Sequence, residues 1–469
     1  MRRVAIVGGG VSGLATAYFL AREGIPTRLF ECRSRLGGVI RTDSLEGCRV
    51  EAGPDSWLAE KTWMLDLVRE LGLGRQVIGS NDSRRRTYIV RGGRAVPLPD
   101  SMRLLAPAKP WQALTTPLFG PATKARMALE WFRRPRSHPD RSVAAFVRDH
   151  FGMEAVEHLA QPLLAGVYGS PPEALSAQSV IPRFVEYERR YGSVLRGTFA
   201  NRHRKSRLPL FQTLRDGMGT LTDALERRAE GACAVVRERV LGVGRDSQGW
   251  SLRLRGRSCA ADTVVLAVPA FEASRLLSSV APRLAGLLAG TEYTSSVVAA
   301  LIYPRPGFGH TLDGFGLLVP RAEPGDVAAC TWVSTKFEGR APGNRALLRA
   351  FITGTAAERA LAASDRTILR RTDAELRRHM GFGGAPIAGA VFRHAKAMPR
   401  YAVGHGERQA EIEDRLRRLP GLHLAGNGCD GLGIPDCVRR SERVAASIAA
   451  GQGRARAAGR PVRPGAGQP

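Results

Sequence analysis

The sequence lacks several features that mark common protein classes. Its seven cysteines are odd in number and dispersed, and none forms a CxxC pair, which favours a reducing compartment over a disulfide-bonded secreted protein. No apolar run approaches the roughly 20 residues that a membrane-spanning helix needs, and a strand is expected almost at Met1, which leaves no room for a secretory signal. We therefore expect a cytoplasmic protein, and a peripheral position at the inner face of the cell membrane stays open.

Other absences narrow the chemistry. Lysine is scarce although Lys and Arg together number 70, and the one dense basic tract, at 84–86, has no interleaved aromatic residues of the kind that stack nucleic-acid bases. The nine histidines are scattered, no His or Cys residues have metal-ligand spacing, and no GxSxG motif is present. We expect no nucleic-acid partner, no metal and no protein nucleophile. The net charge of +27 instead suits a polyanionic substrate or an anionic surface.

The first 42 residues contain a dinucleotide-binding pattern. The apolar run at 3–7 predicts a buried parallel strand, and residues 14–23 predict the helix that follows. In the GxGxxG turn between them, the first glycine allows the tight turn, the second lets backbone approach a diphosphate, and the third lets helix and strand pack closely. The turn consists of Gly8, Gly9, Gly10, Val11, Ser12 and Gly13. The diphosphate would accept hydrogen bonds from free N–H groups at the helix N-terminus.

An acidic residue and a second glycine pair follow the turn and bear on the identity of the cofactor. The predicted strand at 27–30 ends in Glu31, which lies eighteen residues after Gly13, near the spacing of an acid that binds ribose hydroxyls. Gly37 and Gly38 then occur where a nicotinamide dehydrogenase would continue into ordinary strand and helix. This second pair indicates backbone held against another part of the cofactor. The segment RLGGVIRT at 35–42 resembles the flavoprotein variant of the dinucleotide fold, and this resemblance favours FAD over NAD.

The length of 469 residues predicts two or three domains. A parallel-type strand at 263–270, and the order strand, glycine turn, helix at 421–436, indicate that the chain returns twice to the cofactor domain. We expect an α/β fold with a Rossmann-type FAD-binding domain split along the chain, an α+β substrate domain and a mostly helical subdomain. The expected boundaries are 1–86, 214–270 and 409–450 for the FAD-binding domain, 87–213 for the helical subdomain, 271–408 for the substrate domain and 451–469 for a disordered tail.

Local patterns predict further elements. We expect a hairpin with a Gly-Gly turn at 87–99, apolar helices at 111–119 and 127–132, a turn-rich segment at 161–171, a strand at 239–244 and a last helix at 436–450. After a strand that ends near residue 52, Gly53 and Pro54 shape backbone that a flat ring could approach.

Several segments together resemble the FAD-dependent protoporphyrinogen and coproporphyrinogen oxidases of haem biosynthesis, a group within the flavin amine oxidase superfamily. The likeness runs from about residue 3 to residue 448. It rests on EAGP at 51–54, YGSVLRG at 191–197, GFGLLVPR at 314–321, and GN at 426–427 with GLGIPDC at 431–437. The chain departs from the family at Cys429, where tyrosine is frequent, and at Ser441 with Glu442, where a small residue and a glycine often open the final helix.

The resemblance implies which residues line the cofactor. It implies that Val240 contacts the adenine through its backbone and that Ile434 contacts the flavin ring. The full expected set is Gly8, Gly9, Gly10, Val11, Ser12, Gly13, Glu31, Cys32, Gly37, Gly38, Val39, Gly53, Pro54, Asp55, Ser56, Val240, Gly433 and Ile434. Arg91 matches a position where the family can carry an arginine that binds a substrate propionate, and a solvated surface arginine is the alternative. No protein residue is expected to be catalytic, because the flavin carries the chemistry.

The implied reaction is the six-electron oxidation of a porphyrinogen to a porphyrin in three hydride transfers to the flavin, with molecular oxygen as acceptor and hydrogen peroxide as by-product. Protoporphyrinogen IX is ranked slightly first, because a basic, apolar helical subdomain suits docking near a dicarboxylic substrate at a membrane. The tetra-acid coproporphyrinogen III is the alternative. More distant alternatives are a flavin amine oxidase, a carotenoid desaturase, and a catalytically inactive FAD-binding scaffold in a haem assembly.

Overall fold

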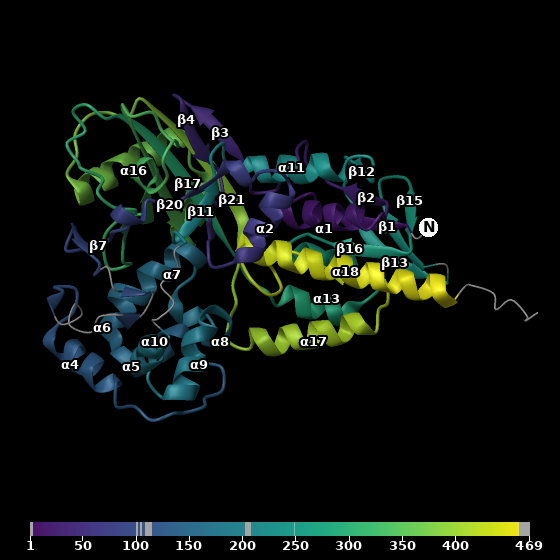
Figure 1. Cartoon of the computed structure of the whole chain (residues 1–469), viewed down its shortest axis with the longest axis horizontal. Helices are drawn as coiled ribbons and strands as arrows, with labels where there is room; N and C mark the ends of the chain where they lie inside the picture. Colours follow the sequence, from purple (N-terminus) through teal and green to yellow (C-terminus); the bar gives the residue numbers. More distant parts are fainter. Residues whose placement is uncertain are drawn as a thin grey trace, which may run out of the picture. The chain divides into compact units, whose positions relative to one another are not determined.

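The structure is a computed structural model that describes residues 3–99, 102–103, 106–107, 115–201, 208–247 and 249–458. The chain forms two compact units, each assembled from separated segments (Figure 1). The first unit contains the chain up to Gly38, residues 222–289 and the chain from Ile412 onward, and the second contains residues 39–221 and 290–411. Segments that are far apart in the sequence therefore share a core in each unit.

The first unit is built on a five-stranded parallel sheet with the order β12-β2-β1-β16-β22. Every residue of the central strand β1 (Val4–Val7) is buried, as in a strand that is covered on both faces. It pairs in register with β2 (Thr27–Phe30) and with β16 (Thr263–Leu266). The edge strands are β12 (Cys233–Val236) and β22 (Leu422–Leu424). The predicted Rossmann-type sheet is confirmed.

Two helices of this unit pack against each other. They are α1 (Val11–Arg22) and α18 (Ile434–Ala458), the purple and the yellow helix of Figure 1. The hydroxyl group of Ser441 in α18 donates a hydrogen bond of 2.9 Å to the Ser12 carbonyl oxygen in α1. The unit also contains α12 (Ala270–Leu277), α13 (Pro282–Ala289) and an antiparallel sheet of β13 (Gly242–Asp246), β14 (Gly249–Arg253) and β15 (Ser258–Ala261).

The second unit contains a seven-stranded sheet with the order β21-β17-β20-β19-β18-β7-β8. Its strands are β7 (Thr87–Arg91), β8 (Arg94–Pro97), β17 (Tyr293–Pro304), β18 (Gly316–Leu318), β19 (Val327–Trp332), β20 (Arg345–Thr353) and β21 (Ala388–Pro399). The β7–β8 hairpin is present as predicted, but β7 pairs in parallel with β18. The hairpin therefore extends this sheet and does not open the helical part of the chain, which differs from the boundary expected at residue 87.

The second unit contains further strands and helices. They are β3 (Thr42–Leu45), β4 (Cys48–Glu51), β5 (Trp57–Leu58), α2 (Thr62–Glu70), β6 (Val77–Gly79), β9 (Met102–Arg103), β10 (Ala106–Pro107), β11 (Phe211–Leu214), α14 (Val333–Lys336), α15 (Gly354–Ala362) and α16 (Asp365–Met380). Short 3-10 turns occur at Gly74–Gln76, Asp82–Arg84 and Pro172–Ala174. The helices α11 (Gly219–Ala229) and α17 (His405–Arg417) run from one unit into the other.

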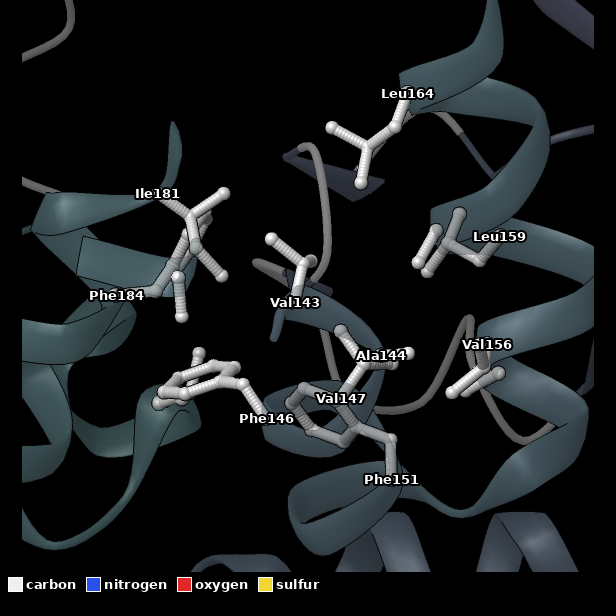
Figure 2. Close-up of a cluster of buried hydrophobic side chains, with 14 of the residues drawn as sticks. Val143, Ala144, Phe146, Val147, Phe151, Val156, Leu159, Leu164, Ile181 and Phe184 are labelled. Carbon is white, nitrogen blue, oxygen red and sulfur yellow. The ribbon is translucent and has the colours of Figure 1, made fainter. Parts of the chain in front are cut away.

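Helices within residues 115–201 of the second unit pack around an apolar core that also includes Ile89 of β7 and Leu98. They are α4 (Pro121–Glu130), α5 (Val143–Phe151), α6 (Met153–Ala155), the π-helix η3 (Val156–Ala160), α7 (Gln161–Tyr168), α8 (Ala177–Val180), α9 (Pro182–Tyr191) and α10 (Val194–Ala200). Figure 2 shows Val143, Val147 and Phe151 of α5 among side chains from the other helices. The spacing of these three residues by four places them on one face of α5, which explains why that face is buried.

A cluster of buried charged side chains, His150 with Glu130 and Glu188, lies within this apolar core. The fully buried ring of His150 lies with Nδ1 2.8 Å from Glu130 Oε1 and Nε2 3.0 Å from Glu188 Oε1. Both nitrogens face carboxylate oxygens, so both carry a proton. Burial lowers the pKa of His150, but the hydrogen bonds to Glu130 and Glu188 outweigh it and raise that pKa above its ordinary value. Arg141 donates to Glu188 at 2.7 Å, and Glu130 accepts from the N–H of Val194 at 2.6 Å.

Three local predictions differ from the structure in whole or in part. Residues 161–168 are helix α7 and not a turn, and the chain turns only after the helix, at Gly169, whose φ is +59°. Residues 239–241 are not a strand, because β13 begins at Gly242. The last helix begins at Ile434 and runs to Ala458, so Ser441 lies inside it and 451–458 are helical; residues 459–469 lie outside the described residues.

The two predicted apolar helices have different outcomes. Residues 111–114 of the helix expected at 111–119 lie outside the described part of the chain, and residues 116–119 are not helical. The helix expected at 127–132 belongs to α4, which ends at Glu130. Across the described residues, no helix combines the length and the apolar composition that crossing a bilayer requires.

Candidate functional site

The turn between β1 and α1 leaves the N-terminus of α1 without a side-chain cap. The N-cap residue is Gly10, which has no side chain to accept a hydrogen bond from the first turn, and no acidic residue lies in that turn. Gly8 has a φ of +106°, and a Cβ on it would lie 2.4 Å from the Ala267 carbonyl oxygen. A Cβ on Gly13 would lie 1.9 Å from the Gly8 carbonyl oxygen. The turn itself therefore requires glycine at both positions.

Gly10 differs from these two glycines. Its φ of −73° and ψ of −177° are open to any residue, and a Cβ there would meet only the Cα of Gly38, at 3.9 Å. The fold thus leaves space in front of Gly10, at the point where this motif brings backbone close to a diphosphate. N–H groups without partners in their helix, together with the positive end of the helix dipole, suit an anion in that space.

The second glycine pair lies directly against the first. The Gly37 N–H donates to the Gly9 carbonyl oxygen at 2.8 Å, and residues 10 and 37 form a parallel β-bridge. The Arg35 guanidinium donates to the carbonyl oxygens of Leu36, at 2.8 Å, and of Gly38, which fixes the backbone of the pair. The structure therefore brings together the two glycine segments that the sequence indicated.

Glu31 lies at the carboxyl end of β2, beside the glycine turn. Its Oε2 accepts a hydrogen bond from the Gly9 N–H at 2.7 Å, and its Oε1 accepts one from the Arg33 N–H at 2.8 Å. A carboxylate has about four lone-pair positions, so both oxygens retain capacity for ribose hydroxyl groups. Cys32 follows with an exposed, free thiol.

The remaining predicted residues of the first unit lie near the starts of β13 and α18. Val240 is buried, and its carbonyl oxygen accepts a hydrogen bond of 3.4 Å from Arg275. Gly433 precedes α18, and its carbonyl oxygen accepts the N–H of Asp436 at 3.0 Å. Ile434, the first residue of α18, is buried.

Val39 and residues 53–56 belong to the second unit. Val39 is 40% exposed, and a Cβ on Gly53 would lie 2.2 Å from the Val39 carbonyl oxygen, so only glycine allows the two segments to approach this closely. Hydrogen-bonding groups from other parts of the unit contact the carbonyl oxygens of Ala52, Gly53 and Asp55. His394 Nε2 lies 2.8 Å from the Ala52 oxygen, Arg349 donates to the Gly53 oxygen at 2.6 Å, and the Thr213 hydroxyl donates to the Asp55 oxygen at 2.6 Å.

A buried ion network that the sequence analysis missed supports this segment. Glu51 pairs with Arg340 at 2.7 Å, and Asp55 pairs with Arg349 at 3.0 Å and with Lys336 at 3.5 Å. Burial raises the pKa of Asp55, but Lys336 and Arg349 outweigh it and hold that pKa below its usual range. Burial, together with the charges of Arg349 and Arg340, lowers the pKa of Lys336 below its ordinary value although Asp55 raises it. The available signal was Arg349 within the apolar run at 346–352.

Arg91 lies at the end of β7 in the second unit. Its guanidinium donates to the Pro117 carbonyl oxygen, and its Nη2 lies 3.5 Å from Glu154 Oε1. The Arg91 side chain is 38% exposed. These contacts fix the position of the guanidinium and leave part of it accessible.

The sequence matches the family described as flavin containing amine oxidoreductase over residues 11–449. The chain belongs to this family. It is 30% identical to the coproporphyrinogen III oxidase of Bacillus subtilis, over 93% of this chain and 96% of that protein. It is 33% identical to the coproporphyrinogen III oxidase of Mycobacterium bovis, over 95% of this chain and 97% of that protein.

The fold of the chain is also similar to that of a solved structure. The crystal structure of an Exiguobacterium protein described as "Putative protoporphyrinogen oxidase" has a TM-score of 0.86 and 28% identity, and the comparison covers 96% of this chain and 99% of that one. The chain therefore falls in the group of the family that contains these porphyrinogen oxidases, and it is an FAD-dependent oxidoreductase.

The residues of the first unit fit FAD. The uncapped α1 N-terminus and the space in front of Gly10 suit the diphosphate, and the free lone pairs of Glu31 suit the ribose. When bound, FAD supplies a ring system that accepts hydride from a substrate. The contribution of the protein is to hold the cofactor and orient the substrate.

Proposed function

We propose that this protein oxidises coproporphyrinogen III to coproporphyrin III, with FAD as the hydride acceptor and molecular oxygen as the final acceptor. The observation that carries the proposal is full-length similarity to two bacterial proteins that bear this activity in their names. This changes the order of preference reached from the sequence alone, which ranked protoporphyrinogen IX first.

The charge of the chain supports the same substrate. Coproporphyrinogen has four propionates and protoporphyrinogen has two, so a chain with a net charge of +27 attracts the tetra-acid more strongly at long range. Protoporphyrinogen oxidation remains the second candidate, and it is favoured by the name of the Exiguobacterium neighbour.

The residues then divide into groups by role. The glycine turn binds the diphosphate, Glu31 binds the ribose, and Val39, residues 53–56, Val240, Gly433 and Ile434 complete the surroundings of the FAD. Arg91 binds a propionate through the accessible part of its guanidinium, for which a planar fork of donors suits a carboxylate. No protein residue exchanges covalent bonds with the substrate.

The test is the product formed in air. One porphyrinogen and three O2 should give one porphyrin and three H2O2, measured together by porphyrin fluorescence and by a peroxide assay. The protein purified with its flavin should convert coproporphyrinogen III at this ratio and should not oxidise simple primary or secondary amines. Amine oxidation without porphyrin formation would establish the flavin amine oxidase alternative instead.

A further inference from the structure

Lys336 is a buried lysine whose Nζ atom lies at long hydrogen-bond distances from its nearest oxygen atoms in the second unit. It is the last residue of α14, and its side chain is 9% exposed. The Nζ atom lies 3.5 Å from Asp55 Oδ1 and 3.4 Å from the Ser56 hydroxyl oxygen. Charge-assisted hydrogen bonds are usually about 2.7–2.9 Å long, so both contacts are weak. The rings of Phe211 and Phe337 lie beside it, with centroids 4.4 Å and 4.9 Å from Nζ.

The carboxylates of the network are already engaged by other donors. Glu51 accepts hydrogen bonds from Arg340, from the Met218 N–H at 2.8 Å and from the Thr42 hydroxyl at 2.8 Å. Asp55 accepts from Arg349 at 3.0 Å and from the Ser56 hydroxyl at 2.6 Å. These two carboxylates face two arginines, which stay charged under all ordinary conditions. A protonated Lys336 therefore gives the network an excess of one positive charge.

This excess charge lies next to a segment with a proposed role. Asp55 and Ser56, the two residues that contact Lys336 Nζ, are among those expected to line the FAD. A buried cation next to a ligand is screened little by solvent, so its field acts on that ligand more strongly than a surface charge does. The following step rests on the proposed function, because it takes FAD to lie at residues 53–56.

We propose that Lys336 supplies a buried positive charge that stabilises the FAD after hydride transfer and thereby raises its reduction potential. A hydride carries two electrons and one proton, so FAD gains one negative charge when it accepts one. The donor carbon loses the hydride, and the substrate then releases one proton to restore its charge. A cation next to residues 53–56 favours the reduced FAD, which carries the added negative charge. Lys336 is thus a positioning and electrostatic residue, and it exchanges no atoms.

The test is the midpoint potential of the bound FAD, measured anaerobically against a redox dye. Lys336→Met should bind FAD and shift the equilibrium toward the oxidised form by tenfold or more, which is a fall of about 30 mV or more for a two-electron couple. Lys336→Arg should keep a potential near that of the wild type. Lys124→Met is the matched control: it removes one lysine charge from α4, far in sequence from Lys336, and should leave the potential unchanged. Lys336→Gln provides a second neutral side chain should the Met variant fail to fold.

The outcomes separate this inference from the proposed function. An unchanged potential in a neutral variant that retains FAD overturns the inference, even if the variant oxidises coproporphyrinogen III. Loss of FAD from all three Lys336 variants also overturns it, because the side chain would then serve folding. If the neutral Lys336 variants show the expected potential shift but the wild-type protein oxidises no porphyrinogen, the proposed function is overturned and this inference is not.

Discussion

A methyl group added at Gly10 tests the diphosphate site without disturbing the turn that carries it. The backbone angles of Gly10 suit alanine, and the nearest atom to the new Cβ is the Gly38 Cα at 3.9 Å. Alanine is a poorer N-cap than glycine, so we expect the free energy of unfolding of the FAD-free protein to fall by no more than about 1 kcal/mol. The methyl group would instead occupy the space next to the uncapped N–H groups of α1.

The expected loss of FAD affinity follows from the hydrogen bonds at risk. Displacing the diphosphate by one methyl radius breaks at least one hydrogen bond to a charged oxygen, which is worth about 1.5–3 kcal/mol. This corresponds to a Kd for FAD that rises about 10- to 150-fold. Gly10→Val, with a branched side chain at the same place, should abolish FAD retention.

The assay is FAD titration of the deflavinated protein, followed by flavin fluorescence, with urea unfolding in parallel. Gly286→Ala is the matched control, because a Cβ there meets no atom within 4 Å and the residue lies inside α13. It should leave the Kd unchanged and stabilise the helix by about 0.5–1 kcal/mol. Gly13→Ala should lose stability and binding together, since its Cβ would lie 1.9 Å from the Gly8 oxygen. Wild-type affinity in Gly10→Ala would refute the placement of the diphosphate.

Three further predictions concern the second unit. Arg91→Ala should raise KM for the porphyrinogen with unchanged flavin content, measured by steady-state kinetics, and an unchanged KM would reduce Arg91 to a surface charge. Arg340→Met should lower the free energy of unfolding by about 3–5 kcal/mol in urea, because it leaves the buried Glu51 without its cation; a loss below 1 kcal/mol would contradict this. The stability difference between wild type and His150→Gln should be largest between about pH 4.5 and 6.5 and should shrink on both sides. Above pH 6.5 the difference shrinks because His150, whose pKa is raised, loses its proton. Below pH 4.5 it shrinks because Glu188, whose pKa is lowered to about 2, gains a proton. A stability difference that is constant across pH would contradict the charged His150–Glu188 pair.

The parts of the fold that the sequence predicted depend on local spacing. Neighbours within a few residues determine the strand at 27–30 and the turn at 8–13. The structure has β2 at Thr27–Phe30, and α1 begins within the predicted turn, at Val11. The strand predicted at 263–270 was recognisable because a strand buried on both faces is continuously apolar, but β16 ends at Leu266 and Ala270 begins α12. The family resemblance then indicated residues from distant segments that no spacing rule would have linked.

The buried network could not be predicted in the same way. Arg340 and Arg349 reach Glu51 and Asp55 only because the fold brings β20 and its preceding loop against the end of β4, and sequence separations of this size carry no pairing signal. Gly166 was read as a turn residue because glycine favours turns, whereas it lies inside helix α7. Charge alone also could not assign the substrate, because arginines are spread along nearly the whole chain.

The most direct test of the account is a side-by-side measurement of kcat/KM for coproporphyrinogen III and protoporphyrinogen IX with the FAD-containing wild-type protein. We expect oxidation of both macrocycles with a kcat/KM at least about tenfold higher for coproporphyrinogen III, a difference of about 1.4 kcal/mol in transition-state binding. A preference for protoporphyrinogen IX would contradict the substrate assignment, and no oxidation of either porphyrinogen would contradict the proposed function itself.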